Sequence, residues 1–342
     1  MTMPTTAQPR SGRELLELEM ARQQADALAS INANQPNSVQ AAESMRRTGR
    51  LFMIGMGASH YANRIAEPLY RHAGIEAWAT TAADELTSPL PAAAPATRLF
   101  VSQSGESGEI VELIGKLGDQ RDAFAITLDP GSTLGRALPS LIGAGGGEIA
   151  FAATRSLTVT LALHGALFAA LGGSDRGARM ALESPVARGI DAALAALGDK
   201  PAIALAGCGV CRGLAETSGL MLMELARLPA LGFELGQFRH GPLELLSPKL
   251  GVLLLRDADS NEADTRDVAR ATAEAGSPPV VFDCSGRDAL SGAVTVAFPA
   301  RGGLGAVLTM LPSLQRLIIG IAAARVEPVG EPLRSTKITR SA

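Results

Sequence analysis

The sequence predicts an α/β protein with two tandem domains, each a doubly wound, flavodoxin-like parallel sheet flanked by helices. Strand-like apolar runs alternate with helical stretches, which is typical of a parallel sheet covered on both faces. The alternation starts again after residue 200 with a similar strand, glycine turn and helix. A chain of 342 residues also exceeds what one hydrophobic core usually organises.

In the first half, residues 11–47 predict one or two leading helices, because charged and apolar residues recur at three- and four-residue spacing. A strand, a tight turn and a helix then follow at 51–54, 55–59 and 60–73. The further strands predicted here are 76–80, 98–102 and 123–128, and the further helices are 109–117 and 153–172.

The second half repeats this opening with a strand at 202–206, a turn at 207–209 and a helix at 210–228. Its other predicted strands are 230–234, 251–255, 280–283 and 294–298. The glycine-containing break at 172–177 places the boundary near 173–195. We therefore predict four parts: a helical segment with a disordered start (1–45), two domains (46–180 and 190–328) and a C-terminal strap (329–342).

The composition narrows the class of protein. A hydrophobic fraction of 46% and a charged fraction of 19% are typical of a compact α/β enzyme. The net charge of −3 and the few aromatic residues make nucleic acid an unexpected partner. Residues 1–12 lack the apolar core of a secretory signal, and three cysteines agree with a reducing compartment, so we expect a cytoplasmic protein.

The most apolar late stretch covers residues 304–326. Pro312, Gln315 and Arg316 interrupt it, which favours a buried amphipathic helix over a membrane span. No membrane partner is expected.

The turn Gly55-Met-Gly57-Ala-Ser59 is the first candidate anion site, because free backbone N–H groups gather where a strand gives way to a helix. A dinucleotide fingerprint would need a third glycine where His60 stands, although Glu76 lies near the expected acidic position. A tight turn without any ligand is the alternative.

The stretch Ser102-Gln-Ser-Gly-Glu-Ser107 is the stronger candidate, since it follows a predicted strand and precedes a predicted helix. One helix cap needs one hydroxyl, whereas three hydroxyls and an amide converge here. The surplus of donors favours a phosphate, whose oxygens accept several hydrogen bonds.

This stretch resembles the phosphate-binding signature of the sugar isomerase (SIS) family, which includes the isomerase half of glucosamine-6-phosphate synthase. Other segments are similar to the family in the same order, from about residue 50 to the end of the chain. They are the turn at 55–59, the stretch Glu148-Ile-Ala-Phe-Ala-Ala-Thr-Arg155, Glu224 with Arg239-His-Gly-Pro242, and the tail Leu333-Arg-Ser-Thr-Lys337-Ile-Thr339.

The resemblance implies a role for each matching residue. Glu224 would be the base that moves a proton between C1 and C2 of an open-chain sugar. His240 would assist ring opening, in this family often from the neighbouring subunit of a dimer, and Lys337 would contact the sugar carbonyl or form an imine with it. The residues implied to hold the phosphate are Ser59, Ser102, Gln103, Ser104 and Ser107, and the further implied substrate contacts are Ala58, Ala153 and Thr336.

Two departures from the family pattern matter. The synthase has Leu-Lys-Leu-Lys before its base, whereas this chain has Leu220-Met-Leu-Met before Glu224. Losing two cations should raise the pKa of the base toward neutrality, unless Arg227 on the same helix face substitutes. Glu216 and Thr217 stand where the family usually has one glutamate, which leaves open whether either touches substrate.

The chain carries no N-terminal glutamine-hydrolysing domain with a leading cysteine, so we do not expect full synthase activity. The resemblance implies a homodimeric amino-sugar-phosphate deaminase/isomerase, with its active site at or near the subunit interface. Glucosamine 6-phosphate would give fructose 6-phosphate and ammonia, without cofactor or metal. Two alternatives stay open, namely a fructosamine-6-phosphate deglycase and a non-catalytic phosphosugar sensor.

The remaining polar residues receive structural interpretations. His60, His72 and His164 lack a second ligand at metal-site spacing, so packing or surface roles are expected. Cys208-Gly-Val-Cys211 lies at a strand-to-helix turn, where a redox pair would also stand, but the phosphosugar signature lies elsewhere in the chain.

Overall fold

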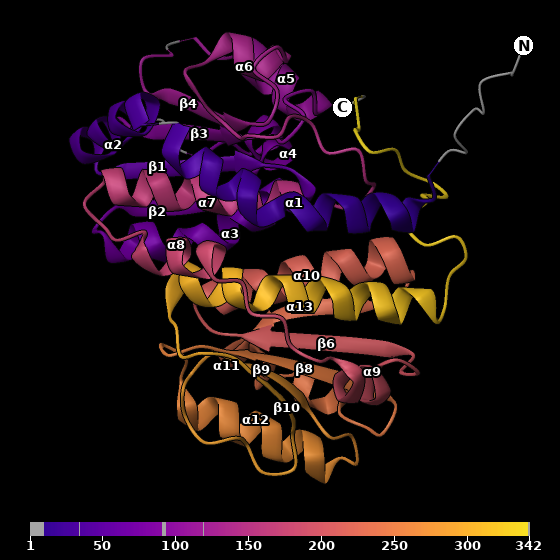
Figure 1. Ribbon diagram of the computed structural model, residues 1–342. Coiled ribbons are helices and arrows are strands. Elements are labelled where there is room, and N and C mark those ends of the chain that lie inside the picture. The colour runs from indigo at the N-terminus through magenta and orange to yellow at the C-terminus, as the bar shows by residue number, and fades with distance from the viewer. Residues whose placement is uncertain (1–9, 34, 91–93, 119, 341–342) are drawn as a thin grey trace, which may run out of the picture.

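The computed structural model describes residues 10–33, 35–90, 94–118 and 120–340. Two five-stranded parallel sheets lie on either side of a central layer of helices (Figure 1). Two parallel sheets flanked by helices confirm the predicted α/β class. The start of the chain was predicted to be disordered, and residues 1–9 lie outside the described residues.

The first sheet has the strand order β2-β1-β3-β4-β5. Successive side chains of a strand point to opposite faces of the sheet. In β1, Leu51 and Met53 therefore join the central core, while Phe52 and Ile54 join an outer core against α4 and α5. The strands are β1 (Arg50–Gly55), β2 (Glu76–Thr81), β3 (Thr97–Val101), β4 (Ala123–Thr127) and β5 (Ser140–Ile142). The helices of this half are α1 (Gly12–Ala33), α2 (Gln35–Thr48), α3 (Gly57–His72), α4 (Ala82–Thr87), α5 (Gly108–Gly115), α6 (Thr133–Ala137), α7 (Arg155–Ala170) and α8 (Arg176–Glu183).

The second sheet has the order β10-β9-β8-β6-β7. In each sheet the first strand lies between the second and the third, which is the flavodoxin-like order. The strands are β6 (Ala202–Gly207), β7 (Ala230–Glu234), β8 (Leu250–Arg256), β9 (Val280–Asp283) and β10 (Val294–Ala297). The helices are α9 (Asp191–Leu197), α10 (Val210–Ala226), α11 (Leu235–Phe238), the short 3₁₀ helix η1 (Pro242–Leu245), α12 (Glu262–Glu274) and α13 (Gly303–Ala323).

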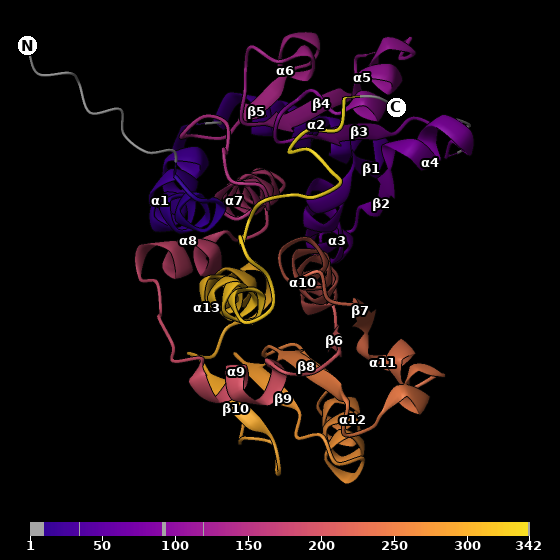
Figure 2. The same ribbon diagram turned by 90° about the vertical axis from the view of Figure 1, so that its right-hand side faces the viewer.

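One continuous hydrophobic core fills the space between the sheets. Helices α3 and α7 from the first half meet α10 and α13 from the second, and α8 packs on α13 (Figure 2). Helices α8 and α9 occupy the stretch where the sequence placed a boundary. The limits 46–180 and 190–328 stay predictions, since the two halves share this core.

Helix α13 is long and apolar enough to cross a membrane by length and composition alone. In the structure 78% of its most apolar window is buried against the other helices of the central layer. This burial agrees with the core helix that the interruptions at Pro312, Gln315 and Arg316 predicted.

The chain after α13 returns to the first sheet. Figure 2 shows this C-terminal strap rising from α13 past α7 and α3 toward α5. The carboxyl ends of β1 and β3, the helix α10 and the strap thereby come together at one place.

Candidate functional site

A cavity of about 480 Å³ opens where β1 and β3 end. The turn after β1, the loop after β3, the loop before α7, one residue of α10 and the strap all line it. Carboxyl ends of parallel strands are the usual ligand position in such sheets. Ten of the eleven residues that the sequence singled out line this cleft: Ala58, Ser59, Ser102, Gln103, Ser104, Ser107, Ala153, Glu224, Thr336 and Lys337.

The loop between β3 and α5 folds around its own hydroxyls. Ser102 Oγ accepts a hydrogen bond from the Gly105 N–H at 3.1 Å, and Ser104 Oγ accepts one from the Glu106 N–H at 3.2 Å. Gly105 turns the chain at φ +66°, a conformation that favours glycine. Ser107 precedes the first residue of α5 but makes no side-chain cap to that helix. Its hydroxyl lies 3.4 Å from Ser102 Oγ, and it lines the cleft at the positive end of α5.

Gln103 presents a second polar group to the cleft. Its Oε1 lies 2.8 Å from Ser156 Oγ, at the start of α7. Its Nε2 is buried and has no hydrogen-bond partner in the described part of the chain. An unpaired buried donor is costly, so a donor in this position is suited to a ligand oxygen.

The turn after β1 brings the chain close to its own helix. A Cβ on Gly55 would lie 3.0 Å from the backbone of Ser59 and His60, so only glycine fits comfortably. Helix α3 begins at Gly57, three residues before the predicted start, because the N–H groups of Ser59 and His60 already donate to the Met56 carbonyl, at 3.0 and 3.3 Å. Ser59 therefore stands in the first turn of α3, where it lines the cleft.

Glu224 reaches the cleft from α10. Burial raises the pKa of its carboxyl to about 7, with Lys337 opposing the increase and Glu148 adding to it. This direction agrees with the expected base near neutrality, although burial is the main cause. Arg227 does not supply the missing cation: it ends α10 in the left-handed conformation and donates to the Glu331 carbonyl at 3.2 Å.

Glu148 is a site residue to which the sequence gave no role. Its Oε1 accepts from the backbone N–H groups of Thr154 and Arg155, at 2.9 and 2.8 Å, so it caps α7 from six residues upstream. The side chain is 1% exposed. The sequence signal for this role was an acidic residue shortly before a long predicted helix. Glu148 lies further from the start of that helix than a standard N-cap residue does.

The strap is held across the cleft by contacts at two places. Lys337 Nζ lies 3.3 Å from Glu148 Oε2 and donates to the Phe151 carbonyl at 3.2 Å. The carbonyl of Thr339 accepts from the Gly108 N–H of α5 at 3.0 Å. Lys337 is thereby placed beside the two carboxylates of the site.

His240 is the one singled-out residue that does not line the cleft. It follows α11 in an exposed loop. Glu216 and Thr217 also lie outside the lining. Glu216 pairs with Arg64 and Arg212, and the Thr217 hydroxyl donates to the Gly213 carbonyl inside α10. Neither residue is placed to touch a ligand in this cleft.

Of the residues given structural interpretations, His72 is exposed, whereas His60 and His164 have internal contacts. The His60 ring lies 3.2 Å from the Thr80 carbonyl, and the buried His164 lies 2.9 Å from the Tyr70 hydroxyl. Burial raises the pKa values of Cys208 and Cys211 above that of a free thiol. Raised values disfavour the reactive thiolate that a redox pair requires.

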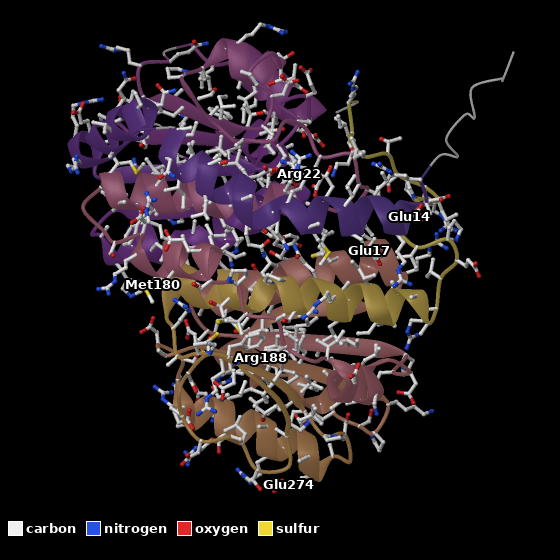
Figure 3. All side chains as sticks on the ribbon, viewed as in Figure 1. Glu14, Glu17, Arg22, Met180, Arg188 and Glu274 are labelled. Carbon is white, nitrogen blue, oxygen red and sulfur yellow. The ribbon has the colours of Figure 1, made fainter. Side chains whose placement is uncertain are left out.

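A second cavity of about 610 Å³ lies between α1, the chain at 185–190 and α13. Glu17, on the α1 side of this cavity, is labelled in Figure 3. Its lining is mostly apolar and, among the described residues, includes no serine or threonine, although Gln23 and Gln24 contribute amides. The smaller cleft is therefore the candidate site for a polar ligand.

Comparison with known proteins agrees with this choice. No protein-family model matches the chain. The glutamine–fructose-6-phosphate aminotransferase (isomerizing) of Lactiplantibacillus plantarum is 27% identical over 66% of this chain and 41% of its own. The enzyme of the same name from Aeropyrum pernix is 29% identical over 66% of this chain and 40% of its own. The chain thus spans about two fifths of the length of these relatives.

Solved structures share the fold over nearly the whole chain. The C-terminal domain of glucosamine-fructose-6-phosphate aminotransferase from Francisella tularensis has a TM-score of 0.78 and 17% identity, and covers 93% of this chain and 98% of its own. Tagatose-6-phosphate ketose/aldose isomerase from Escherichia coli has a TM-score of 0.76 and 21% identity, with 92% and 95% covered. Glucosamine-6-phosphate deaminase from Thermotoga maritima has a TM-score of 0.64 and 16% identity, with 92% and 99% covered.

Proposed function

Because this chain is a sugar-isomerase (SIS) family protein resembling the isomerase half of the glutamine–fructose-6-phosphate aminotransferases, we propose that it converts an amino-sugar 6-phosphate into a ketose 6-phosphate in the cytoplasm. The proposed reaction turns glucosamine 6-phosphate and water into fructose 6-phosphate and ammonia. The observation that carries the proposal is a buried carboxylate, Glu224, facing the same cleft as a cluster of serine hydroxyls. We also propose that the two sheets represent tandem SIS domains.

The phosphate would bind at the loop between β3 and α5. Ser102, Ser104 and Ser107 supply hydroxyls, Gln103 supplies an amide, and α5 contributes the positive end of its dipole. Ser59 adds a hydroxyl from the opposite turn. This set of donors supports recognition of a dianion that accepts several hydrogen bonds at once.

Glu224 would then act on the open-chain sugar. Its carboxylate takes the proton from C2 of the aldehyde form, giving an enolamine, and returns a proton to C1. The product is an imine at C2, which water hydrolyses to the ketose with release of ammonia. A base with a pKa of about 7 suits this task, because it can both accept and return a proton near neutral pH.

Lys337 and His240 would serve the carbonyl chemistry. Lys337 Nζ, held beside Glu148 and Glu224, would hydrogen-bond to the carbonyl oxygen or form an imine with C1. His240 would assist ring opening from the neighbouring subunit of a homodimer. Its exposed position outside the chain's own cleft supports a role in a partner's site.

The carboxylates of the cleft support an amine-bearing substrate. Glu148 and Glu224 both line this cleft. A protonated amino group at C2 would be attracted to this pair, whereas the phosphate would stay at the hydroxyl-rich end. No residue of this scheme calls for a metal or an organic cofactor.

The test supplies glucosamine 6-phosphate, galactosamine 6-phosphate and a fructosamine 6-phosphate separately. Ammonia, free amino acid and ketose are measured together at each pH from 5 to 9. We expect ammonia and fructose 6-phosphate from the first substrate, with a rate that increases with pH around pH 7 as Glu224 ionises. Release of an amino acid from the third substrate alone would instead identify a deglycase.

Two variants on α10 provide the comparison. Glu224→Gln should lower turnover by about 100-fold or more, the usual contribution of a general base. Glu216→Gln changes the same residue type on the same helix outside the cleft, and should keep turnover within about threefold of the unmodified protein. Binding of substrate without turnover in the unmodified protein would indicate a sensor and would refute the proposed reaction.

A further inference from the structure

Helix α1 carries a polar stripe on its buried side. Glu19, Gln23 and Ser30 are each at most 2% exposed, although a helix that packs on a core usually turns apolar residues inward. Every one of them has a partner in the stretch before α7 or in α7 itself. Gln23 accepts from Thr158 at 2.8 Å, and Ser30 Oγ accepts from the Ala144 N–H at 2.8 Å.

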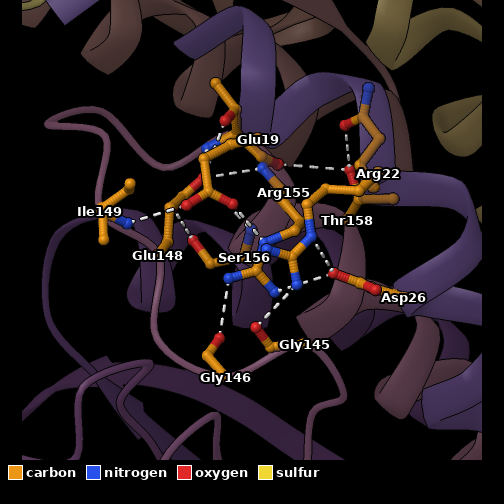
Figure 4. Close-up of polar contacts among 12 residues, drawn as sticks. Glu19, Arg22, Asp26, Gly145, Gly146, Glu148, Ile149, Arg155, Ser156 and Thr158 are labelled. Carbon is orange, nitrogen blue, oxygen red and sulfur yellow. Dashed lines mark hydrogen bonds and ion pairs between the residues drawn. The ribbon is translucent and has the colours of Figure 1, made fainter. Parts of the chain in front are cut away.

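Glu19 contacts the loop before α7 and the first residue of α7. Its Oε1 accepts the N–H of Ile149 at 2.9 Å, the residue directly after Glu148. Its Oε2 accepts from Arg155 Nε at 2.5 Å, the residue that opens α7 (Figure 4). Glu19 thereby holds the backbone directly after Glu148 and the side chain of Arg155.

Arg155 completes the arrangement. Its side chain is fully buried, and its guanidinium donates to the carbonyl of Gly146 at 2.7 Å (Figure 4). It also donates to the carbonyl of Ala144 at 3.1 Å. It also lies 3.3 Å from Asp26 of α1. The side chain thus joins α1 to the backbone just before Glu148.

This network is a poor choice for stability alone. A buried ion pair is often no more stabilising than apolar residues of the same volume. It does define the shape of a loop, since planar guanidinium and carboxylate groups form hydrogen bonds in fixed directions.

We propose that Glu19 and Arg155 are positioning residues of the site, which fix the loop at 144–149 so that Glu148 can anchor Lys337 and the strap over the cleft. The catalytic role of Lys337 in this statement rests on the proposed function. The anchoring itself does not, because it follows from the contacts of Glu148 with Lys337 and of Glu19 with the loop.

The experiment uses the full chain and measures the strap directly. Trypsin can cleave the strap after Arg334, Lys337 and Arg340, and intact mass identifies the product that ends at Lys337. We expect Glu19→Gln to speed this cleavage by about tenfold. The Glu19 carboxylate accepts hydrogen bonds from two N–H donors, whereas the glutamine amide has one oxygen and would turn its NH₂ group toward one of these donors. The double variant Glu19→Met with Arg155→Met leaves no buried unpaired charge, so it tests the same loop in a chain that stays folded.

The matched control is Asp283→Asn. Asp283 on β9 pairs with Arg256, another fully buried arginine, at 3.0 Å in the second sheet. This variant also removes one charge from a buried pair, but away from the strap. It should leave the strap cleavage rate unchanged even where it lowers the melting temperature.

A second measurement separates positioning from general loss of structure. Sorbitol 6-phosphate has the phosphate and open chain but no carbonyl, so its affinity reports the phosphate end of the cleft. We expect its affinity to stay within about threefold in the double variant while turnover falls by about 10- to 100-fold.

The outcomes are distinct. An unchanged cleavage rate in the folded double variant would overturn the positioning role. Faster cleavage together with no turnover and no sorbitol 6-phosphate binding in the unmodified protein would refute the proposed function while supporting the positioning role. Equal acceleration in Asp283→Asn would show that any destabilisation frees the strap, which also overturns the inference.

Discussion

Glu224 shows how one side chain acquires its chemistry from its surroundings. Three of the residues before it on α10, Met221, Leu222 and Met223, are apolar, and only Met223 is clearly exposed. Burial therefore dominates the environment of the carboxylate and raises its pKa to about 7. The strap supplies a nearby cation, Lys337, which limits the increase.

The raised pKa of Glu224 predicts a pH-dependent effect on stability. The carboxyl ionises at about 7 in the folded chain and at its ordinary value of 4.5 in the unfolded chain, so the unfolded chain loses a proton first as pH increases. Stability should therefore fall between pH 4.5 and 7, and Glu224→Gln should remove this loss. At pH 8 we expect the free energy of unfolding of the variant to exceed that of the unmodified protein by at most about 3 kcal/mol. At pH 4 the two free energies of unfolding should be about equal.

Thermal unfolding at pH 4, 6 and 8 measures this difference. Glu216→Gln is the matched control, because its carboxylate pairs with Arg64 and Arg212 and its loss should destabilise the chain at pH 8. At pH 8 the melting temperature of Glu224→Gln should exceed that of the unmodified protein. If it does not, the buried Glu224 carboxylate does not destabilise the folded chain.

Among the elements, the turn between β3 and α5 is the one that the sequence described best. The predicted strand and helix ends fall within one or two residues of β3 and α5. The turn itself depends on Gly105, where a Cβ would overlap the side chain of Ser132. Local sequence therefore specifies this element almost completely.

Replacing Gly105 with alanine should damage both the fold and the phosphate end of the cleft. The left-handed conformation costs a residue with a Cβ about 1–2 kcal/mol, and the overlap with Ser132 adds to this. We expect the affinity for sorbitol 6-phosphate, measured by calorimetry, to decrease by at least about tenfold.

Gly49→Ala provides the control for backbone strain. Gly49 has φ +68°, close to the +66° of Gly105, but a Cβ there would meet nothing within 4 Å. The Gly49→Ala variant should lose a similar amount of stability from backbone strain and keep its affinity for sorbitol 6-phosphate. An equal loss of affinity in both variants would show that the turn does not form the phosphate site.

Helix α1 is the element whose role the sequence did not indicate. The sequence placed it in a separate leading segment. In the structure, Glu19 binds the loop that carries Glu148, and Asp26 lies beside Arg155 at the start of α7. The signal was the polar stripe at positions 19, 23, 26 and 30, but such a stripe is usually a solvated face. Only the packing of α1 on α7 shows that this face is buried.

At the scale of the whole molecule, the two sheets share one strand order but not one chemistry. In the first sheet β3 is followed by the serine-rich loop. In the second sheet β8, the equivalent third strand, is followed by Asp257 and Asp259, with burial raising the pKa of Asp257. Carboxylates at this position would repel a phosphate, so the hydroxyl-rich cradle belongs to the first sheet.

A dimer in which His240 completes the partner's site predicts complementation between inactive variants. Glu224→Gln and His240→Ala would each be inactive alone, but a mixed dimer would contain one site with neither change. Unfolding and refolding the two variants together in equal amounts should restore about a quarter of full activity. Turnover of the mixture is compared with that of each variant refolded separately.

The oligomeric state is measured alongside by light scattering. Activity in the mixture that equals the mean of the separate variants would mean that His240 acts in its own cleft or not at all. A monomer at the concentration of the assay would refute the shared site directly.

The amino-acid sequence was enough to predict the class of fold, the repeat of strand, turn and helix, and the loop from Ser102 to Ser107. These features depend on short-range patterns of apolar residues, glycines and helix caps, which neighbours in the chain specify. Tertiary structure decided the pKa of Glu224, the role of Glu148, the burial of the polar stripe on α1 and the exclusion of Glu216 and Arg227 from the cleft. Each of these depends on burial and on contacts between residues distant in the chain, which no local pattern encodes.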